Sequence, residues 1–82
     1  MNRDVLKSKI TTYLNQNAAV GRDGIESDDQ DLIADGIIDS FGLLGLIAFL
    51  EDEFSIRIDA SDIDPANFNT ISKIIQNVLT QF

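Results

Sequence analysis

Residues 35–54 read DGIIDSFGLLGLIAFLEDEF. Asp39 and Ser40 are residue types favoured at a helix N-terminus, and the apolar run after them predicts a helix over 40–54 that ends just after the acidic triplet 51–53. The apolar arc of this helix is wider than one buried face needs. Part of it is therefore expected at the surface, or lining a site.

Two further amphipathic helices flank this stretch. Residues 3–17, behind a cap at Asn2, have apolar side chains at steps of three and four, namely Leu6, Ile10, Tyr13 and Leu14. Residues 71–82, behind a cap at Asn69 or Thr70, have the same helical spacing, at Ile71, Ile74, Ile75, Val78, Leu79 and Phe82. Both patterns predict a helix with one face turned to a core.

The segment between the second and last helices contains one more helical signal. Pro65, behind a cap at Asp64, predicts a short helix in which Phe68 is the single inward side chain. Residues 56–62 have no second strand-like run to pair with, so we expect them to form a connector.

A long acidic loop of residues 20–39 joins the first two helices, and we expect Leu32 and Ile33 to anchor it to the core. Three longer helices and one short one, with no pair of strands and no internal repeat, predict an all-α fold, a small four-helix bundle. With 82 residues, of which 44% are hydrophobic, the chain fits a single domain over residues 1–82.

The composition excludes several classes of function. The formal net charge is −8, whereas a protein that binds a nucleic-acid backbone needs a basic face. The absence of cysteine and histidine removes disulfides, two kinds of nucleophile and the usual zinc ligands. No apolar run approaches the ~20 residues that span a membrane, and the polar start MNRDVLKSK is not a signal peptide. We expect a soluble, cytoplasmic, free-standing monomer that binds neither nucleic acid nor metal.

The charge is unevenly distributed. Of the 14 acidic residues, all but Asp4 lie between Asp23 and Asp64, a stretch in which Arg57 is the single base. This anionic region is expected to keep the protein soluble and to attract basic partners.

Ser40 is the one hydroxyl that coincides with a helix N-terminus and a neighbouring carboxylate, Asp39. A phosphate ester on Ser40 would lie where free backbone N–H groups and the helix dipole favour an anion. As a catalytic nucleophile Ser40 is poorly equipped, because no histidine is available to deprotonate it. The alternative is that Asp39 or Ser40 is only a helix cap.

The sequence around this pair resembles the acyl and peptidyl carrier protein family. In that family the serine of an Asp-Ser pair at the start of the second helix receives a 4′-phosphopantetheine arm. Asp35-Gly36 precede the pair at the family's distance, EDEF at 51–54 is similar to the family's helix ending, and DPANFNTISKII at 64–75 is similar to its passage from helix three to helix four. The resemblance covers roughly residues 3–81.

The resemblance implies a carrier with no catalytic residues of its own. Ser40 would be the attachment point of 4′-phosphopantetheine from coenzyme A, whose thiol holds an acyl or aminoacyl group as a thioester, and Asp39 would help to position Ser40. Phe41, Leu44 and Ile47, on the exposed part of the helix, would dock partner proteins. The implied partners are a phosphopantetheinyl transferase, an acyl- or aminoacyl-loading ligase and downstream acyl-transfer enzymes.

Gly42 and Gly45 depart from the pattern of fatty-acid carriers, which tend to have acidic residues at these places. In this respect the chain is more similar to D-alanine carriers and to discrete aminoacyl or specialised acyl carriers. Two glycines within a helix cost roughly 1 kcal/mol each relative to alanine, which points to a close approach of a partner or of the arm.

Two other functions would use the acidic residues. A calcium site could draw on Asp28, Asp29, Asp31 and Asp35. However, an EF-hand loop counted from Asp29 would place Ala34 where glycine is needed and Ser40 where glutamate is needed. The main alternative to a carrier is an acidic helical interaction domain, in which Ser40 only caps a helix.

Overall fold

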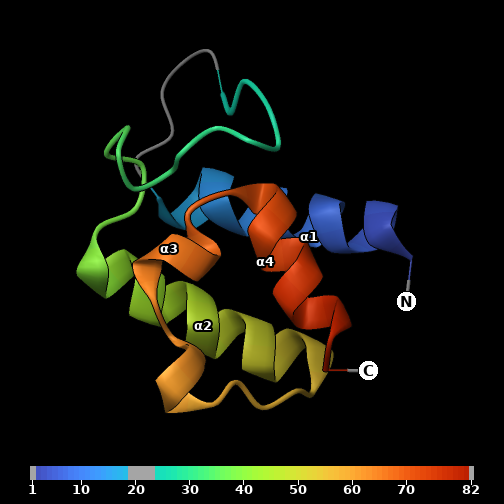
Figure 1. The fold of residues 1–82 in the computed structure, drawn as a ribbon. Coiled ribbons are helices and arrows are strands. Elements are labelled where there is room, and N and C mark those ends of the chain that lie inside the picture. The colour runs from blue at the N-terminus through green and yellow to red at the C-terminus, as the bar shows by residue number, and fades with distance from the viewer. Residues whose placement is uncertain (1, 19–23, 82) are drawn as a thin grey trace.

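A computed structural model describes residues 2–18 and 24–81 of the chain. The described residues form α1 (Arg3–Asn17), α2 (Ser40–Phe54), a short 3-10 helix η1 (Ala60–Asp62), α3 (Pro65–Phe68) and α4 (Ile71–Leu79). They contain no strand, which confirms the prediction of an all-α bundle with three longer helices and one short one. In Figure 1 the start of α1 and the end of α4 lie at the same side of the molecule, and α2 begins at the opposite side. No helix in the described ranges is long and apolar enough to cross a membrane.

The predicted caps define the helix starts. Asn2, Asp64 and Thr70 each accept a hydrogen bond from a backbone N–H in the first turn of α1, α3 and α4 respectively. Thr70 rather than Asn69 is the cap of α4. Caps of this kind stabilise a helix by about 1 kcal/mol each because they satisfy donors that have no partner within the helix.

The inner faces of the helices and two loop segments form one hydrophobic core. Its buried members are Leu6, Ile10, Leu14, Leu32, Ile37, Ile38, Leu43, Leu46, Ile47, Leu50, Phe54, Ile58, Phe68, Ile71, Ile74, Ile75 and Val78. Phe68 is fully buried, which confirms it as the inward side chain of α3. Leu79 is 36% exposed because it lies at the last turn of α4, beyond the core, and Phe82 lies outside the described residues.

Leu32 anchors the loop between α1 and α2, as expected. Its side chain is fully buried and its backbone N–H donates to the carbonyl of Asn69 at 2.6 Å, just before α4. Its own carbonyl accepts hydrogen bonds from Ile37 and Ile38 at 2.8 and 3.0 Å, just before α2. Ile33 is half-buried against the core. The loop therefore connects the start of α4 to the start of α2 through one residue.

Two acidic residues hold the same loop in place. One carboxylate oxygen of Asp31 accepts the N–H of Ala34 at 2.9 Å, and the other accepts the side-chain amide of Asn69 at 3.0 Å. The carbonyl of Asp28 accepts the N–H of Ser72, a donor in the first turn of α4. The backbone hydrogen bond from Ala34 is the largest of the effects that lower the pKa of Asp31 below its ordinary value of 3.8.

We predict that Asp31→Asn flattens the loss of stability at acid pH. Because the pKa of Asp31 is lower in the folded chain than its ordinary value of 3.8, its carboxylate stabilises the fold above that pH, and the stabilisation is lost as the pH falls through the lower folded-state pKa. Denaturant unfolding from neutral pH to well below 3.8 measures the effect.

The matched control is Asp29→Asn, since the carboxylate of Asp29 accepts no hydrogen bond from a described residue. This variant should follow the unmodified chain closely. Equal acid slopes for Asp31→Asn and Asp29→Asn would contradict the role given to Asp31.

Candidate functional site

Asp39 and not Ser40 is the cap of α2. A carboxylate oxygen of Asp39 accepts the N–H of Gly42 at 2.7 Å, and its carbonyl accepts the N–H of Leu43 at 2.8 Å. Ser40 is exposed, and its hydroxyl makes no hydrogen bond to any described residue. The sequence left the cap open between the two residues. The structure assigns it to Asp39, which leaves the oxygen of Ser40 free for chemistry.

The start of α2 favours a negative group beside Ser40. The backbone N–H groups of Ser40 and Phe41 have no acceptor among the described residues, and the first turn contains no acidic side chain. The aligned peptide dipoles of a helix this long place partial positive charge at its N-terminus. The carboxylate of Asp39, next in the chain, offsets part of that charge. A phosphodiester on the Ser40 oxygen nevertheless fits, because the hydroxyl is accessible and free donors lie beside it.

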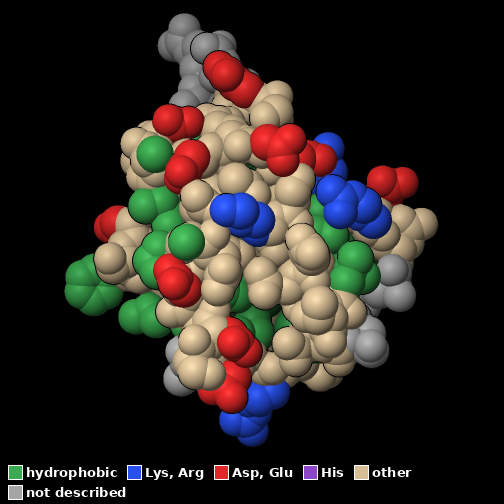
Figure 2. Space-filling model, in the orientation of Figure 1, with side chains coloured by type: hydrophobic (Ala, Val, Ile, Leu, Met, Phe, Trp, Pro, Cys, Tyr) green, Lys and Arg blue, Asp and Glu red, His purple; other side chains and the backbone are tan. Residues whose placement is uncertain are grey.

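The outer face of α2 next to Ser40 is apolar. Phe41 is 84% exposed and Leu44 is 57% exposed. Figure 2 shows hydrophobic side chains protruding at the side of the molecule where α2 begins. The expectation that Ile47 shares this surface is wrong, because Ile47 is only 4% exposed. It lies one helical turn from Leu43 on the inner face of α2 and packs in the core.

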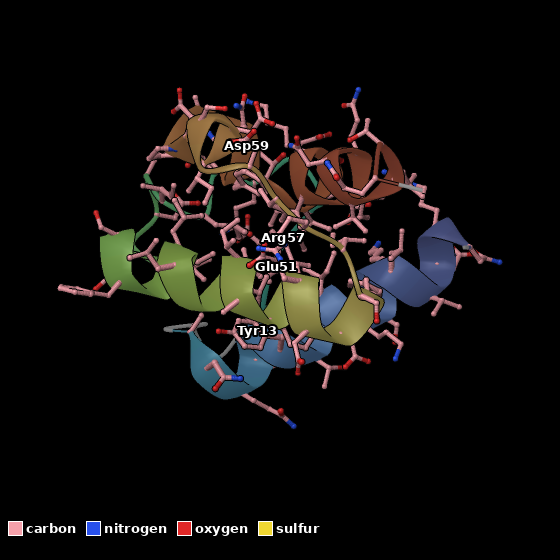
Figure 3. All side chains as sticks on the ribbon, turned by 90° about the horizontal axis from the view of Figure 1, so that it is seen from below. Tyr13, Glu51, Arg57 and Asp59 are labelled. Atoms are coloured by element: carbon pink, nitrogen blue, oxygen red, sulfur yellow. The ribbon has the colours of Figure 1, made fainter. Side chains whose placement is uncertain are left out.

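Gly42 and Gly45 let other parts of the chain approach α2. Figure 3 shows Tyr13 between α1 and α2, and its ring stacks on that of Phe49 with centroids 4.4 Å apart. A Cβ atom at Gly45 would lie 3.0 Å from the Tyr13 hydroxyl oxygen, and one at Gly42 would lie 3.1 Å from a methyl group of Ile38. The close approach expected from the two glycines is therefore made, at least in part, by the chain itself.

A groove of about 180 Å³ opens beside these glycines, between the end of α1 and the start of α2. Its lining residues are Tyr13, Leu14, Asn17, Ala18, Gly36, Ile37, Ile38, Asp39 and Gly42. Gly36 makes the bend at its rim with a left-handed φ of 75°. Sequence reasoning missed this groove. The two glycines were the available signal, but they do not say which side chain lies opposite.

The acidic residues do not gather into a metal site in the described part of the chain. No group of three or more acidic side chains there is placed to hold an ion. Some of these acids have other partners, since Asp28 pairs with Lys7 at 3.0 Å and Asp35 accepts the side-chain amide of Gln30 at 3.0 Å.

The sequence matches the family model described as "Phosphopantetheine attachment site" over residues 8–78. The matched range contains Asp39, Ser40, the whole of α2 and α3, and all of α4 except Leu79. The chain belongs to this phosphopantetheine attachment family. Membership confirms the resemblance stated from the sequence and implies a covalently attached 4′-phosphopantetheine, which the accessible hydroxyl at the start of α2 fits.

The chain is also similar to D-alanyl carrier proteins of Streptococcus pyogenes. Those of serotype M5 (strain Manfredo), serotype M49 (strain NZ131) and serotype M1 are each 40% identical to it over 50 residues. The match covers 61% of this chain and 63% of each relative, so it spans less than two thirds of the relatives' length.

We predict that Asp39→Ala lowers the free energy of unfolding by about 1 kcal/mol, because the N–H of Gly42 loses its acceptor at the start of α2. Asp39→Asn is the matched variant, since its amide oxygen can still accept that hydrogen bond, and it should lose much less. Urea unfolding compares the three proteins. An Asp39→Ala protein as stable as the unmodified chain would show that Asp39 does not fix this turn.

Proposed function

We propose that the chain is an aminoacyl carrier protein in which Ser40 bears 4′-phosphopantetheine. The arm's terminal thiol holds the carried group as a thioester, and residues 1–82 form the single carrier domain, which acts as a monomer in the cytoplasm. The chain supplies no catalytic residues. It binds and presents the group, while partner enzymes perform the reactions.

The observation that carries this proposal is the free hydroxyl of Ser40. It is exposed at the start of α2, beside backbone donors that have no acceptor in the described residues, and Asp39 has already taken the capping role. Asp39 acts as a positioning residue, since its hydrogen bond to Gly42 fixes the turn in which Ser40 lies. The relatives named as D-alanyl carriers support D-alanine, or another small amino acid, as the carried group.

The partners that this role requires are a phosphopantetheinyl transferase, an acyl- or aminoacyl-loading ligase and downstream acyl-transfer enzymes. We propose that they dock on the apolar outer face of α2, where Phe41 and Leu44 protrude beside the attachment point. Aromatic side chains of this kind are common anchors at protein interfaces. Gly42 and Gly45 leave this part of the helix without charge, so contact at short range is apolar.

One prediction of this proposal concerns attachment of the arm. Incubation with coenzyme A and a broad-specificity phosphopantetheinyl transferase should increase the intact mass by one phosphopantetheine. Ser40→Ala should show no increase. Ser8→Ala, which removes an exposed serine of α1, is the matched control and should be modified normally. A folded chain that stays unmodified beside an active transferase would overturn the carrier role and favour the acidic interaction domain.

Another prediction of this proposal concerns docking of the transferase. Phe41→Ala should lower the kcat/KM of the transferase roughly ten-fold, since truncating an exposed aromatic anchor commonly costs more than 1 kcal/mol of binding. Its effect on stability should stay within about 0.5 kcal/mol, because the side chain is 84% exposed.

Val5→Ala serves as the control, because Val5 is an apolar residue of α1 that is 44% exposed and lies outside α2. Its transferase kinetics should match those of the unmodified chain. Equal losses in the two variants, or none in Phe41→Ala, would contradict docking on α2.

A further inference from the structure

The nucleophilic side chains of this protein are few. The chain has three lysines, Lys7, Lys9 and Lys73, and it has no cysteine or histidine. Lysine amines are therefore the side chains best suited to attack a thioester, with which they form an amide. Under the proposed function the same chain holds a thioester on a tether. Any lysine within reach of the tether meets that thioester at a high effective concentration.

Two of the three lysines are paired with carboxylates. The Nζ atom of Lys7 lies 3.0 Å from a carboxylate oxygen of Asp28, and Lys9 forms an ion pair with Glu53. Acylation of a lysine removes its positive charge and with it the ion pair. Reaction at Lys7 or Lys9 therefore has to break an existing contact with a carboxylate.

Lys73, in the first turn of α4, has a neutral partner instead. Its Nζ donates to the backbone carbonyl of Ala66 in α3 at 3.0 Å, and no carboxylate of the described residues forms an ion pair with it. Lys73 is exposed and lines a surface groove of about 340 Å³, in which no lining residue is acidic. An acylated Lys73 still has one N–H, so the product amide can keep the hydrogen bond to Ala66.

Lys73 also lies at the end of the bundle where α2 begins. The N–H of Leu32 donates to the carbonyl of Asn69, just before α4, and Lys73 follows in the first turn of that helix. The carbonyl of Leu32 accepts the N–H of Ile38, just before Ser40. Figure 1 shows α3, whose backbone holds the Lys73 amine, beside the first half of α2.

The length of the arm distinguishes the two ends of α2. From the Ser40 oxygen to its thiol, 4′-phosphopantetheine has about 14 bonds, which extend over roughly 16 Å at the ~3.5 Å that a peptide covers in three bonds. Lys9 is held by Glu53, which lies about 20 Å from Ser40 along α2 at 1.5 Å per residue. The tether therefore favours Lys73, which lies at the end from which the arm starts.

We propose that Lys73 is a self-acylation site, at which the acyl group of the carrier's own thioester becomes an amide when no partner enzyme takes it. The uncharged amine of Lys73 attacks the carbonyl carbon of the thioester, so that a C–N bond forms and the C–S bond breaks. The proton that the nitrogen loses goes to the departing thiolate, and the arm regains its thiol. The inference rests on the attachment proposed above, and the reaction needs no other reactant.

Acetyl-coenzyme A provides the probe, because a broad-specificity phosphopantetheinyl transferase can attach an acetylated arm from it in one step. Excess acetyl-coenzyme A is removed, and the protein is incubated at mildly alkaline pH. Hydroxylamine then cleaves the remaining thioester and spares amides. Intact mass should show an acetyl group that resists hydroxylamine, and peptide mapping should place it on Lys73.

Two variants and one labelled chain make the test specific. Lys73→Arg, which keeps the charge and a donor for Ala66, should lose the resistant acetyl group, whereas Lys9→Arg should keep it. An isotopically labelled Ser40→Ala chain in the same solution reports the reaction without a tether. At about 10 μM, this chain should gain roughly a hundred-fold less acetyl group on Lys73, because a short tether gives an effective concentration in the mM range.

Three outcomes would overturn the inference. They are a resistant acetyl group that maps equally to all three lysines, equal acetylation of the tethered and the labelled chains, and no resistant group in a chain that has received the acetylated arm. A chain that receives no arm at all would instead overturn the attachment proposal.

Discussion

The backbone of Leu32 joins the long loop to two helix starts at once. Its N–H is bonded to Asn69 at the start of α4, and its carbonyl receives the N–H groups of Ile37 and Ile38 just before α2. Its side chain is fully buried in the core that both helices share. Ile38, which is held in this way, lies only two residues before the start of α2. The position of Ser40 therefore depends on this anchor. A loop of this length that lacked it would leave the functional end of α2 without support.

Acidic and apolar side chains occupy different parts of the surface. Acidic residues of the loop serve its own structure, as when Asp31 binds Asn69 and Asp28 pairs with Lys7. Figure 2 shows acidic side chains over the loop, while apolar ones protrude where α2 begins. Under the proposed function, the anionic surface would attract basic partners at long range, and the apolar face of α2 would contact them at short range. Asp39 is also acidic, but its side chain accepts the N–H of Gly42 at the start of α2 and so lies within the candidate site.

Much of the fold could be predicted because it depends on residues one turn apart. The spacing of Ile71, Ile74, Ile75 and Val78 fixes the buried face of α4, and Asn2, Asp64 and Thr70 mark helix starts by their side-chain chemistry. The same logic failed for Ile47. Apolar residues surround most of α2, so the pattern does not distinguish its inner face from its outer face.

Contacts between distant parts of the sequence lay beyond this reasoning. Nothing in the sequence near Leu32 indicates that its N–H will meet Asn69, and nothing near Gly45 indicates that Tyr13 lies opposite. The site was recoverable in part, because Asp39 and Ser40 combine a helix start with a hydroxyl. The division of roles between them required the geometry, in which one caps the helix and the other is left free.

Hydrogen exchange of the backbone amides at Leu32, Ile37 and Ile38 tests most directly whether this anchor holds the start of α2. All three amides donate hydrogen bonds within the anchor. The account predicts that they exchange only when the whole domain unfolds, with the same free energy of opening as the amides in the core of α4. Fast exchange of these three amides, in a protein whose α4 amides stay protected, would contradict it.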